Sequence, residues 1–219
     1  MTMDPLVERL RRLDACAVSD ALDKCGLTGV ATGIPQFSGA GRSAGRAITV
    51  KLGVGNRGSG PPKHLCANAI EIGEPDNVIV VEQRSGVEAA GWGGLLSQGA
   101  LVRGIAGVIV DGPVRDIDQS IELGFPVFAR SLTSLTARGR LVELSTNERV
   151  TVGEVTVDAG DYVIADRSAV IFVPAAEIDR VLAAAEDIAA REDAMAKALR
   201  AGKPIGAVMG GDYEDMLRS

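Results

Sequence analysis

An arginine and an aspartate, Arg115 and Asp116, follow a short apolar segment in the middle of the chain. The segment, residues 106–110, predicts a strand buried on both faces, and Asp111-Gly112 indicates a turn at its end. Open α/β sheets bind their ligands beyond the carboxyl ends of such strands. Arginine offers a planar fork of donors to a carboxylate, and aspartate is a hard oxygen ligand for a divalent cation. The pair therefore indicates an anion and metal site, with an ion pair within a loop as the alternative.

Four further side chains could take part in chemistry, and each also has a purely structural explanation. His64 is the chain's only histidine, and it is either an acid–base group near neutral pH or a polar helix residue. Glu192 lies in the apolar stripe of the last predicted helix, where it is either functional or a solvated charge. Lys51, in a predicted strand, is a weak candidate for a Schiff base. Trp92 either lines a pocket or packs in the core.

A glycine pattern near the start of the chain resembles a nucleotide-binding motif. Gly53, Gly55 and Gly58 form GxGxxG after a predicted strand, and Glu82 ends the next strand. A dinucleotide-binding fold needs a helix to begin inside this motif, but residues 59–62 (SGPP) delay it. We therefore expect no dinucleotide site, although Arg57 could reach a substrate carboxylate from this loop.

Composition limits the classes of protein that this chain can represent. Its 219 residues are enough for one large domain, or a domain plus an arm, and its 3% aromatic content predicts an aliphatic core. A net charge of -6 without a Lys/Arg run argues against nucleic-acid binding. Three cysteines without a CxxC pair indicate reduced thiols. The sequence shows neither a membrane span nor a signal peptide, so we expect a cytoplasmic protein that does not bind membranes.

Alternating elements between residues 46 and 112 predict a parallel sheet. Strands are expected at 47–54, 77–82 and 106–110, with helices at 64–72 and 95–103. A further helix at 15–24 takes Asp14 as its N-cap, and residues 27–45 form a loop. A helix at 117–123 and a strand at 126–129 complete this part.

The pattern changes after Gly139, where five short strands predict antiparallel, barrel-like β-structure. These strands are expected at 141–144, 149–152, 154–157, 162–165 and 170–173. A long helix follows from 175 to about 201. We therefore divide the chain into an α/β core, residues 1–175, and a C-terminal helix and tail, residues 176–219, that packs on the core or on a neighbouring subunit.

The stretch GWGGLLSQGALVRGIAGVIVDGPVRD, residues 91–116, closely resembles the signature of the RraA-like family. That family includes 4-hydroxy-4-methyl-2-oxoglutarate / 4-carboxy-4-hydroxy-2-oxoadipate aldolases and regulators of RNase E activity. Further segments fit in order, at 18–22, 45–50, 125–129, 155–161 and 171–174. The resemblance implies a swivelling-domain β/β/α sandwich. It also implies trimers or dimers of trimers with active sites at subunit boundaries.

The resemblance implies roles for residues at the matching positions. Arg115 would bind the substrate carboxylate and Asp116 would ligate Mg²⁺ or Mn²⁺. The glycine-rich helix start, which comprises Gly93, Gly94, Leu95 and Leu96, would hold the pyruvyl group through backbone amides. Glu192 is the best match to a glutamate that family aldolases lend to a neighbouring subunit, and His64 falls on a helix that borders the site.

Two positions depart from the aldolase pattern. Gly94 stands where family aldolases carry an aspartate that holds a metal-bound water, and Gln119 replaces a frequent acidic residue. Such a loss can cost roughly 10–100-fold in metal affinity or activity. We expect a metal-dependent lyase that gives pyruvate from small 2-oxo acids by retro-aldol cleavage or by oxaloacetate decarboxylation, which needs less acid–base help. The alternatives are a non-catalytic regulator that binds a ribonuclease and a divergent lyase or hydratase on a related hydroxy acid.

Overall fold

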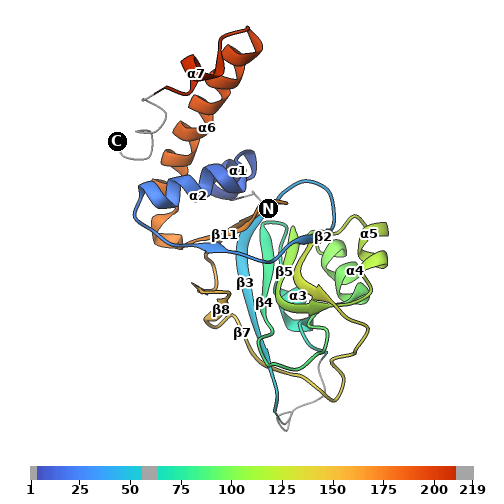
Figure 1. Cartoon of the computed structure of the whole chain (residues 1–219). Coiled ribbons are helices and arrows are strands. Elements are labelled where there is room, and N and C mark those ends of the chain that lie inside the picture. The colour runs from blue at the N-terminus through green and yellow to red at the C-terminus, as the bar shows by residue number, and fades with distance from the viewer. Residues whose placement is uncertain (1–3, 56–63, 211–219) are drawn as a thin grey trace.

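The computed structural model describes residues 4–55 and 64–210, which form a mixed β-sheet with helices packed against it (Figure 1). The sheet order is β1-β11-β10-β3-β4-β5-β6-β2, and β7 pairs with the far end of β3. The strands are β1 (Val30–Ala31), β2 (Gln36–Ser38), β3 (Ser43–Gly53), β4 (Asn77–Glu82), β5 (Gly107–Val114), β6 (Val127–Leu132), β7 (Val142–Thr146), β10 (Tyr162–Ala165) and β11 (Val170–Val173).

The centre of the sheet is parallel, as the alternating pattern predicted. Strands β3, β4, β5 and β6 pair in parallel in that order. The helices α3 (Ala67–Ile72), α4 (Gly94–Val102) and α5 (Ile117–Glu122) connect them and lie on the same side of the sheet in Figure 1. Apolar side chains of these strands, such as Ile79 and Val110, are fully buried in one cluster with residues of α3 and α4. Burial of this apolar surface fixes the helices over the strands.

The later strands continue this sheet instead of forming a unit of their own. Strand β10 pairs antiparallel with β3, and β11 and β1 extend the edge beyond it. The remaining two strands, β8 (Val150–Val152) and β9 (Val155–Val157), form a separate hairpin. The antiparallel prediction for residues 139–173 is therefore correct, and most of it extends the mixed sheet.

Three helices cover the end of the sheet formed by β10 and β11. They are α1 (Pro5–Arg12), α2 (Ala15–Lys24) and α6 (Ile178–Arg200), with a 3₁₀ turn, η1 (Ala175–Glu177), before α6. Helix α2 begins where Asp14 predicts it, since the Asp14 carboxylate accepts a hydrogen bond of 2.8 Å from the Ala17 amide. Residues Leu22 and Leu182 of α2 and α6 are buried in a shared cluster.

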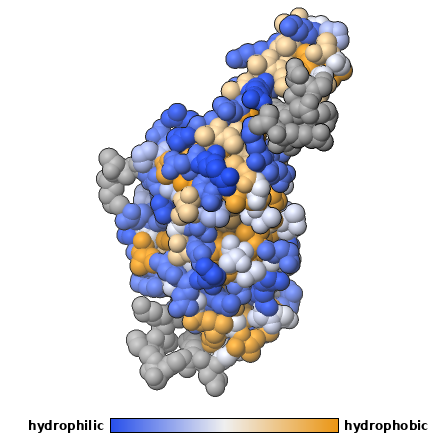
Figure 2. Space-filling model, turned by 90° about the vertical axis from the view of Figure 1, so that its left-hand side faces the viewer, coloured by the Kyte–Doolittle hydropathy of each residue, from blue (hydrophilic) through white to orange (hydrophobic). Residues whose placement is uncertain are grey.

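The second half of α6 leaves the body of the protein. Buried residues of α6 end at Ile188. Figure 1 shows the following turns projecting away from the sheet, with the short helix α7 (Ile205–Val208) beside them, and the space-filling view in Figure 2 shows a part that protrudes from the body of the protein. In the described part of the chain, no helix is long and apolar enough to span a bilayer.

Two sequence-based boundaries were wrong for identifiable reasons. Strand β5 continues through Asp111 and Gly112 to Val114, because the buried Asp111 carboxylate accepts hydrogen bonds from Arg130 Nε (2.6 Å) and the Gly153 amide (2.7 Å). Helix α3 begins at Ala67 because Cys66 has a left-handed backbone, φ 63°.

The segment expected to be a loop at 27–45 also contains β1, β2 and the start of β3. The end of the GxGxxG motif and Arg57 lie outside the described residues.

Candidate functional site

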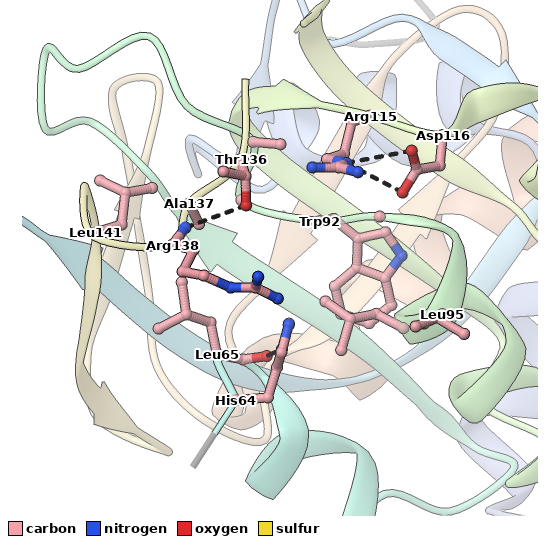
Figure 3. A pocket seen from close by; sticks show the side chains of 14 residues that line it. His64, Leu65, Trp92, Leu95, Arg115, Asp116, Thr136, Ala137, Arg138 and Leu141 are labelled. Carbon is pink, nitrogen blue, oxygen red and sulfur yellow. Dashed lines mark hydrogen bonds and ion pairs between the residues drawn. The ribbon is translucent and has the colours of Figure 1, made fainter. Parts of the chain in front are cut away.

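A pocket of about 200 Å³ lies beside the end of β5 and the start of α4. Its lining residues fall within four segments, 64–65, 90–96, 115–116 and 136–141. Figure 3 shows Arg115 and Asp116 on one side of this pocket, with Arg138 and His64 across from them. The volume is below the roughly 300–1,000 Å³ of pockets for drug-sized ligands, so the pocket suits a small metabolite.

The Arg115–Asp116 pair is accessible from this pocket. Arg115 Nε donates to both carboxylate oxygens of Asp116, at 3.2 and 3.1 Å. The two side chains remain 37% and 36% exposed, respectively. An ion pair at this exposure contributes little to stability, at most about 1 kcal/mol. The pair is therefore not a packed structural element, and both groups can be reached by a ligand.

Backbone hydrogen bonds hold this pair in place. The Gly91 amide donates to the Pro113 carbonyl (2.8 Å), and the Arg115 amide donates to the Trp92 carbonyl (3.0 Å). Asp116 itself has a left-handed backbone, φ 55°, at the N-cap of α5. Aspartate and asparagine adopt this conformation more readily than most residues. The turn out of β5 thus directs both side chains to the same side.

The start of α4 presents backbone amides beside Asp116. The Gly94 amide donates to Asp116 Oδ2 at 3.2 Å, whereas the Leu96 amide donates to the Gly93 carbonyl at 3.0 Å. Among the described residues, the Leu95 amide makes no hydrogen bond. Leu95 is therefore the better placed of the two predicted amide donors. A β-carbon at residue 93 would lie 2.9 Å from Asp116 Oδ2, so the Asp116 carboxylate can lie this close to the start of α4 only because residue 93 is glycine.

Trp92 lines the pocket and also packs in the core, so both predicted roles apply. Its ring stacks on Phe125 with centroids 6.3 Å apart. Its Nε1 donates to Ser97 Oγ (2.9 Å), which is 2.9 Å from Ser120 Oγ. These bonds satisfy the buried indole N–H and connect the pocket wall to α4 and α5.

His64 and Arg138 complete the opposite side of the pocket. His64 precedes α3, and its Nδ1 donates to the Leu65 carbonyl (2.9 Å), which leaves Nε2 for a ligand. Arg138 could not be predicted from the sequence, because it lies in an irregular loop after β6 where no periodicity marks it. Only its folded position, across the pocket from Arg115, identifies it.

Two candidates lie away from the pocket within one chain. Lys51 pairs with Glu82 at 3.1 Å and does not line the pocket, which argues against a Schiff-base role there. Glu192 is exposed on α6. Partial burial, and then the charges of Asp14 and Asp20, raise the pKa of the Glu192 carboxyl. The chain therefore does not bring Glu192 to its own pocket.

The donor set beside the pocket fits a hard divalent cation. In the described residues no cluster of three or more His, Cys, Asp or Glu side chains forms a closed metal cage. Mg²⁺ commonly binds through one or two carboxylates and completes its shell with waters and substrate oxygens. The open carboxylate of Asp116 meets that requirement, whereas a structural zinc site would need more ligands.

A family model described as RraA-like (Aldolase/RraA) matches residues 15–172 of this chain. The chain belongs to the RraA-like family. The match includes Arg115, Asp116 and the start of α4, so the pocket lies within the family region. The family resemblance and the fold class expected from the sequence are thus confirmed.

Relatives in this family are distant. Protein DlpA of Legionella pneumophila is 27% identical over 204 residues, which cover 93% of this chain and 33% of DlpA. This chain therefore spans about a third of DlpA's length. A Halalkalibacterium halodurans protein, named as a proposed 4-hydroxy-4-methyl-2-oxoglutarate aldolase, is 28% identical over 193 residues, 88% of each chain.

Solved structures share the RraA-like fold. An uncharacterized protein from Pseudomonas syringae pv. tomato has a TM-score of 0.84 at 25% identity and covers 94% of this chain and 96% of its own. RraAS2 of Streptomyces coelicolor, described as an unusual member of the RNase ES inhibitor RraA family, has a TM-score of 0.78 at 23% identity. It covers 87% of this chain and 96% of its own.

Proposed function

We propose that this protein is a divalent-metal-dependent lyase of small 2-oxo acids that gives pyruvate. The reaction would be retro-aldol cleavage, as in a 4-hydroxy-4-methyl-2-oxoglutarate aldolase, or decarboxylation of oxaloacetate. One observation carries the proposal: Arg115, Asp116 and Leu95, whose amide makes no hydrogen bond within the described residues, line one small open pocket. These groups provide a carboxylate clamp, a hard metal ligand and an anion-binding amide.

Each group has a defined task in this proposal. The Arg115 guanidinium binds the substrate carboxylate and exchanges part of its contact with Asp116 for it. Asp116 would hold Mg²⁺ or Mn²⁺, which, when bound, supplies Lewis-acid stabilisation of the charge that develops on the keto oxygen. The Leu95 amide, at the N-terminus of α4, orients the same anionic end. Buried Trp92 limits water on one wall of the pocket.

The proposal includes an assembly of this chain. Glu192 lies on α6 and not beside the pocket, so it can serve the reaction only in the pocket of a neighbouring copy. A trimer or a dimer of trimers would bring it there, in line with the family resemblance. Its raised pKa, caused by burial and then by Asp14 and Asp20, suits a group that exchanges protons.

The experiment measures pyruvate release from oxaloacetate and from 4-hydroxy-4-methyl-2-oxoglutarate with Mg²⁺ or Mn²⁺. Arg115→Ala should reduce kcat/KM by on the order of 10²-fold or more, because a charge-stabilising donor is lost. Asp116→Asn should remove the metal dependence and Mn²⁺ binding, and asparagine tolerates the same left-handed backbone. Arg167→Ala, which removes an equal charge from the exposed β10–β11 turn, is the control.

No pyruvate from either substrate with either metal would contradict the lyase proposal. Retention of full activity by Arg115→Ala would contradict the assigned site even if pyruvate is released. In the first case, the non-catalytic alternative, binding to a ribonuclease, becomes the better explanation.

A further inference from the structure

The pocket holds more positive charge than is needed to bind a ligand with one carboxylate. Two guanidinium groups line it, Arg115 and Arg138, against one carboxylate, Asp116, among the described lining residues. This local excess stands out in a chain whose net charge is -6. A metal at Asp116 would increase the excess, so the pocket favours a ligand with more than one negative charge.

Hydrogen bonds fix the loop backbone around Arg138, whose side chain is exposed at the pocket. The Arg138 amide donates to Thr136 Oγ1 (3.2 Å), and Arg140 Nη1 donates to the Thr136 carbonyl (3.0 Å). The Ala90 amide donates to the Leu135 carbonyl (3.0 Å), which fastens the same loop to the pocket wall. Figure 3 shows the Arg138 side chain extending between the Arg115–Asp116 pair and His64.

Among the described residues, the Arg138 guanidinium has no protein acceptor. Arg115 donates to Asp116, and Arg130 to Asp111, but within the described ranges no hydrogen bond or ion pair engages the Arg138 side chain. Asp116 is the sole carboxylate among the described residues that line the pocket. A guanidinium positioned at a cavity without a partner is suited to bind a ligand's carboxylate.

We infer that Arg138 binds the second carboxylate of a dicarboxylic 2-oxo acid and thereby selects diacids over monoacids. The inference rests on the proposed function, in which Arg115 and the metal take the 2-oxo acid end. Arg138 is then the specificity-determining residue for the distal end. His64 borders this position.

Ligand binding can be measured without turnover, because Trp92 is the chain's only tryptophan and lines the pocket. Tryptophan fluorescence of the full chain with Mg²⁺ is titrated with pyruvate and with 2-oxoglutarate, which is pyruvate with an added carboxymethyl group. Arg138→Ala should weaken 2-oxoglutarate binding about tenfold and pyruvate binding less than about twofold, as for one lost charged hydrogen bond. Arg138→Lys should restore part of the difference, and Arg167→Ala should change neither affinity.

Equal losses for both ligands in Arg138→Ala would overturn the inference, because they would indicate a structural role. An unchanged 2-oxoglutarate affinity, or a wild-type protein without preference for 2-oxoglutarate, would also overturn it. Failure of the lyase proposal looks different: pyruvate release is then absent while the preference for 2-oxoglutarate persists and depends on Arg138.

Discussion

The side chain of Gln119 fills the space beside Gly94. A β-carbon at residue 94 would overlap Gln119 Oε1 and would lie 3.1 Å from Gln119 Cβ. These are the two positions at which the chain departs from the family's aldolases. The two departures are therefore linked: the side-chain amide of Gln119 occupies the space that an aspartate side chain at position 94 would need.

Gly94→Asp should restore the missing carboxylate most effectively when position 119 is made small. We expect Gly94→Asp/Gln119→Ala to tighten Mn²⁺ binding by about tenfold, the lower end of the effect of such a ligand-supporting group. Gly94→Asp alone should gain less, since the two side chains compete for space. Mn²⁺ titration of both single variants and the double variant forms a double-mutant cycle. Strict additivity of the two changes would contradict the coupling.

Gly93→Ala should impair the site without unfolding the protein. The added β-carbon lies 2.9 Å from Asp116 Oδ2 and 3.2 Å from Arg115 Cγ, and it displaces the pair. We expect roughly a tenfold or larger loss of Mn²⁺ affinity or pyruvate release. Gly99→Ala, inside α4, has 3.7 Å of clearance and should be neutral or stabilising by about 0.5–1 kcal/mol. Thermal unfolding separates a loss of stability from a loss of Mn²⁺ affinity. Wild-type Mn²⁺ affinity and pyruvate release in Gly93→Ala would contradict the geometry.

Glu192 should act in a neighbouring subunit's pocket. Arg115→Ala and Glu192→Gln are each expected to be nearly inactive as homo-oligomers. Co-expressed in equal amounts, they should regain about a quarter of wild-type activity, because a quarter of random interfaces join an intact Arg115 to an intact Glu192. Pyruvate release from the purified mixed oligomer is the measurement. No recovery in verified mixed oligomers would remove Glu192 from the site.

Asp166 should make stability depend on pH in the acid range. Partial burial alone would raise its pKa, but amides of Ala15, Ser168 and Ala169 donate to the carboxylate and lower its pKa below the ordinary 3.8. The Asp166 carboxylate thus stabilises the fold fully at pH values above its pKa in the unfolded chain. This stabilisation is lost as the pH falls through its lower pKa in the folded protein. We expect Asp166→Asn to cost about 1 kcal/mol at neutral pH after solvent screening.

Urea unfolding of Asp166→Asn at pH 7 and pH 3 tests this expectation. The difference from wild type should shrink at the lower pH, where the wild-type carboxylate becomes protonated. Asp193→Asn, on the exposed part of α6, serves as the control and should leave stability unchanged at both values. A difference that is independent of pH would contradict the role of the Asp166 charge.

Local signals predicted much of the fold. Helix α2 and strands β4, β10 and β11 have the boundaries that periodicity, turn residues and the Asp14 cap indicated. These signals work because capping and alternating burial act over a few residues. The position of Arg115 and Asp116 at the end of a central strand followed from the same local pattern.

Features that depend on residues far apart in the sequence could not be predicted from local sequence patterns. The turn predicted at Asp111 is absent because Arg130 and Gly153, far along the chain, satisfy its buried carboxylate. Strand β2 exists because β6 pairs with it. Arg138 reaches the site only because its loop is fastened to Ala90. Each depends on tertiary contacts that override local preference.

The projecting half of α6 keeps Glu192 away from the pocket of its own chain. In the proposed assembly, each chain provides Glu192 to a neighbouring pocket and receives the glutamate of another copy, so activity requires the oligomer. Mass action would then govern its output: specific activity should fall when the protein is diluted below the dissociation constant of the oligomer, and it should recover on concentration.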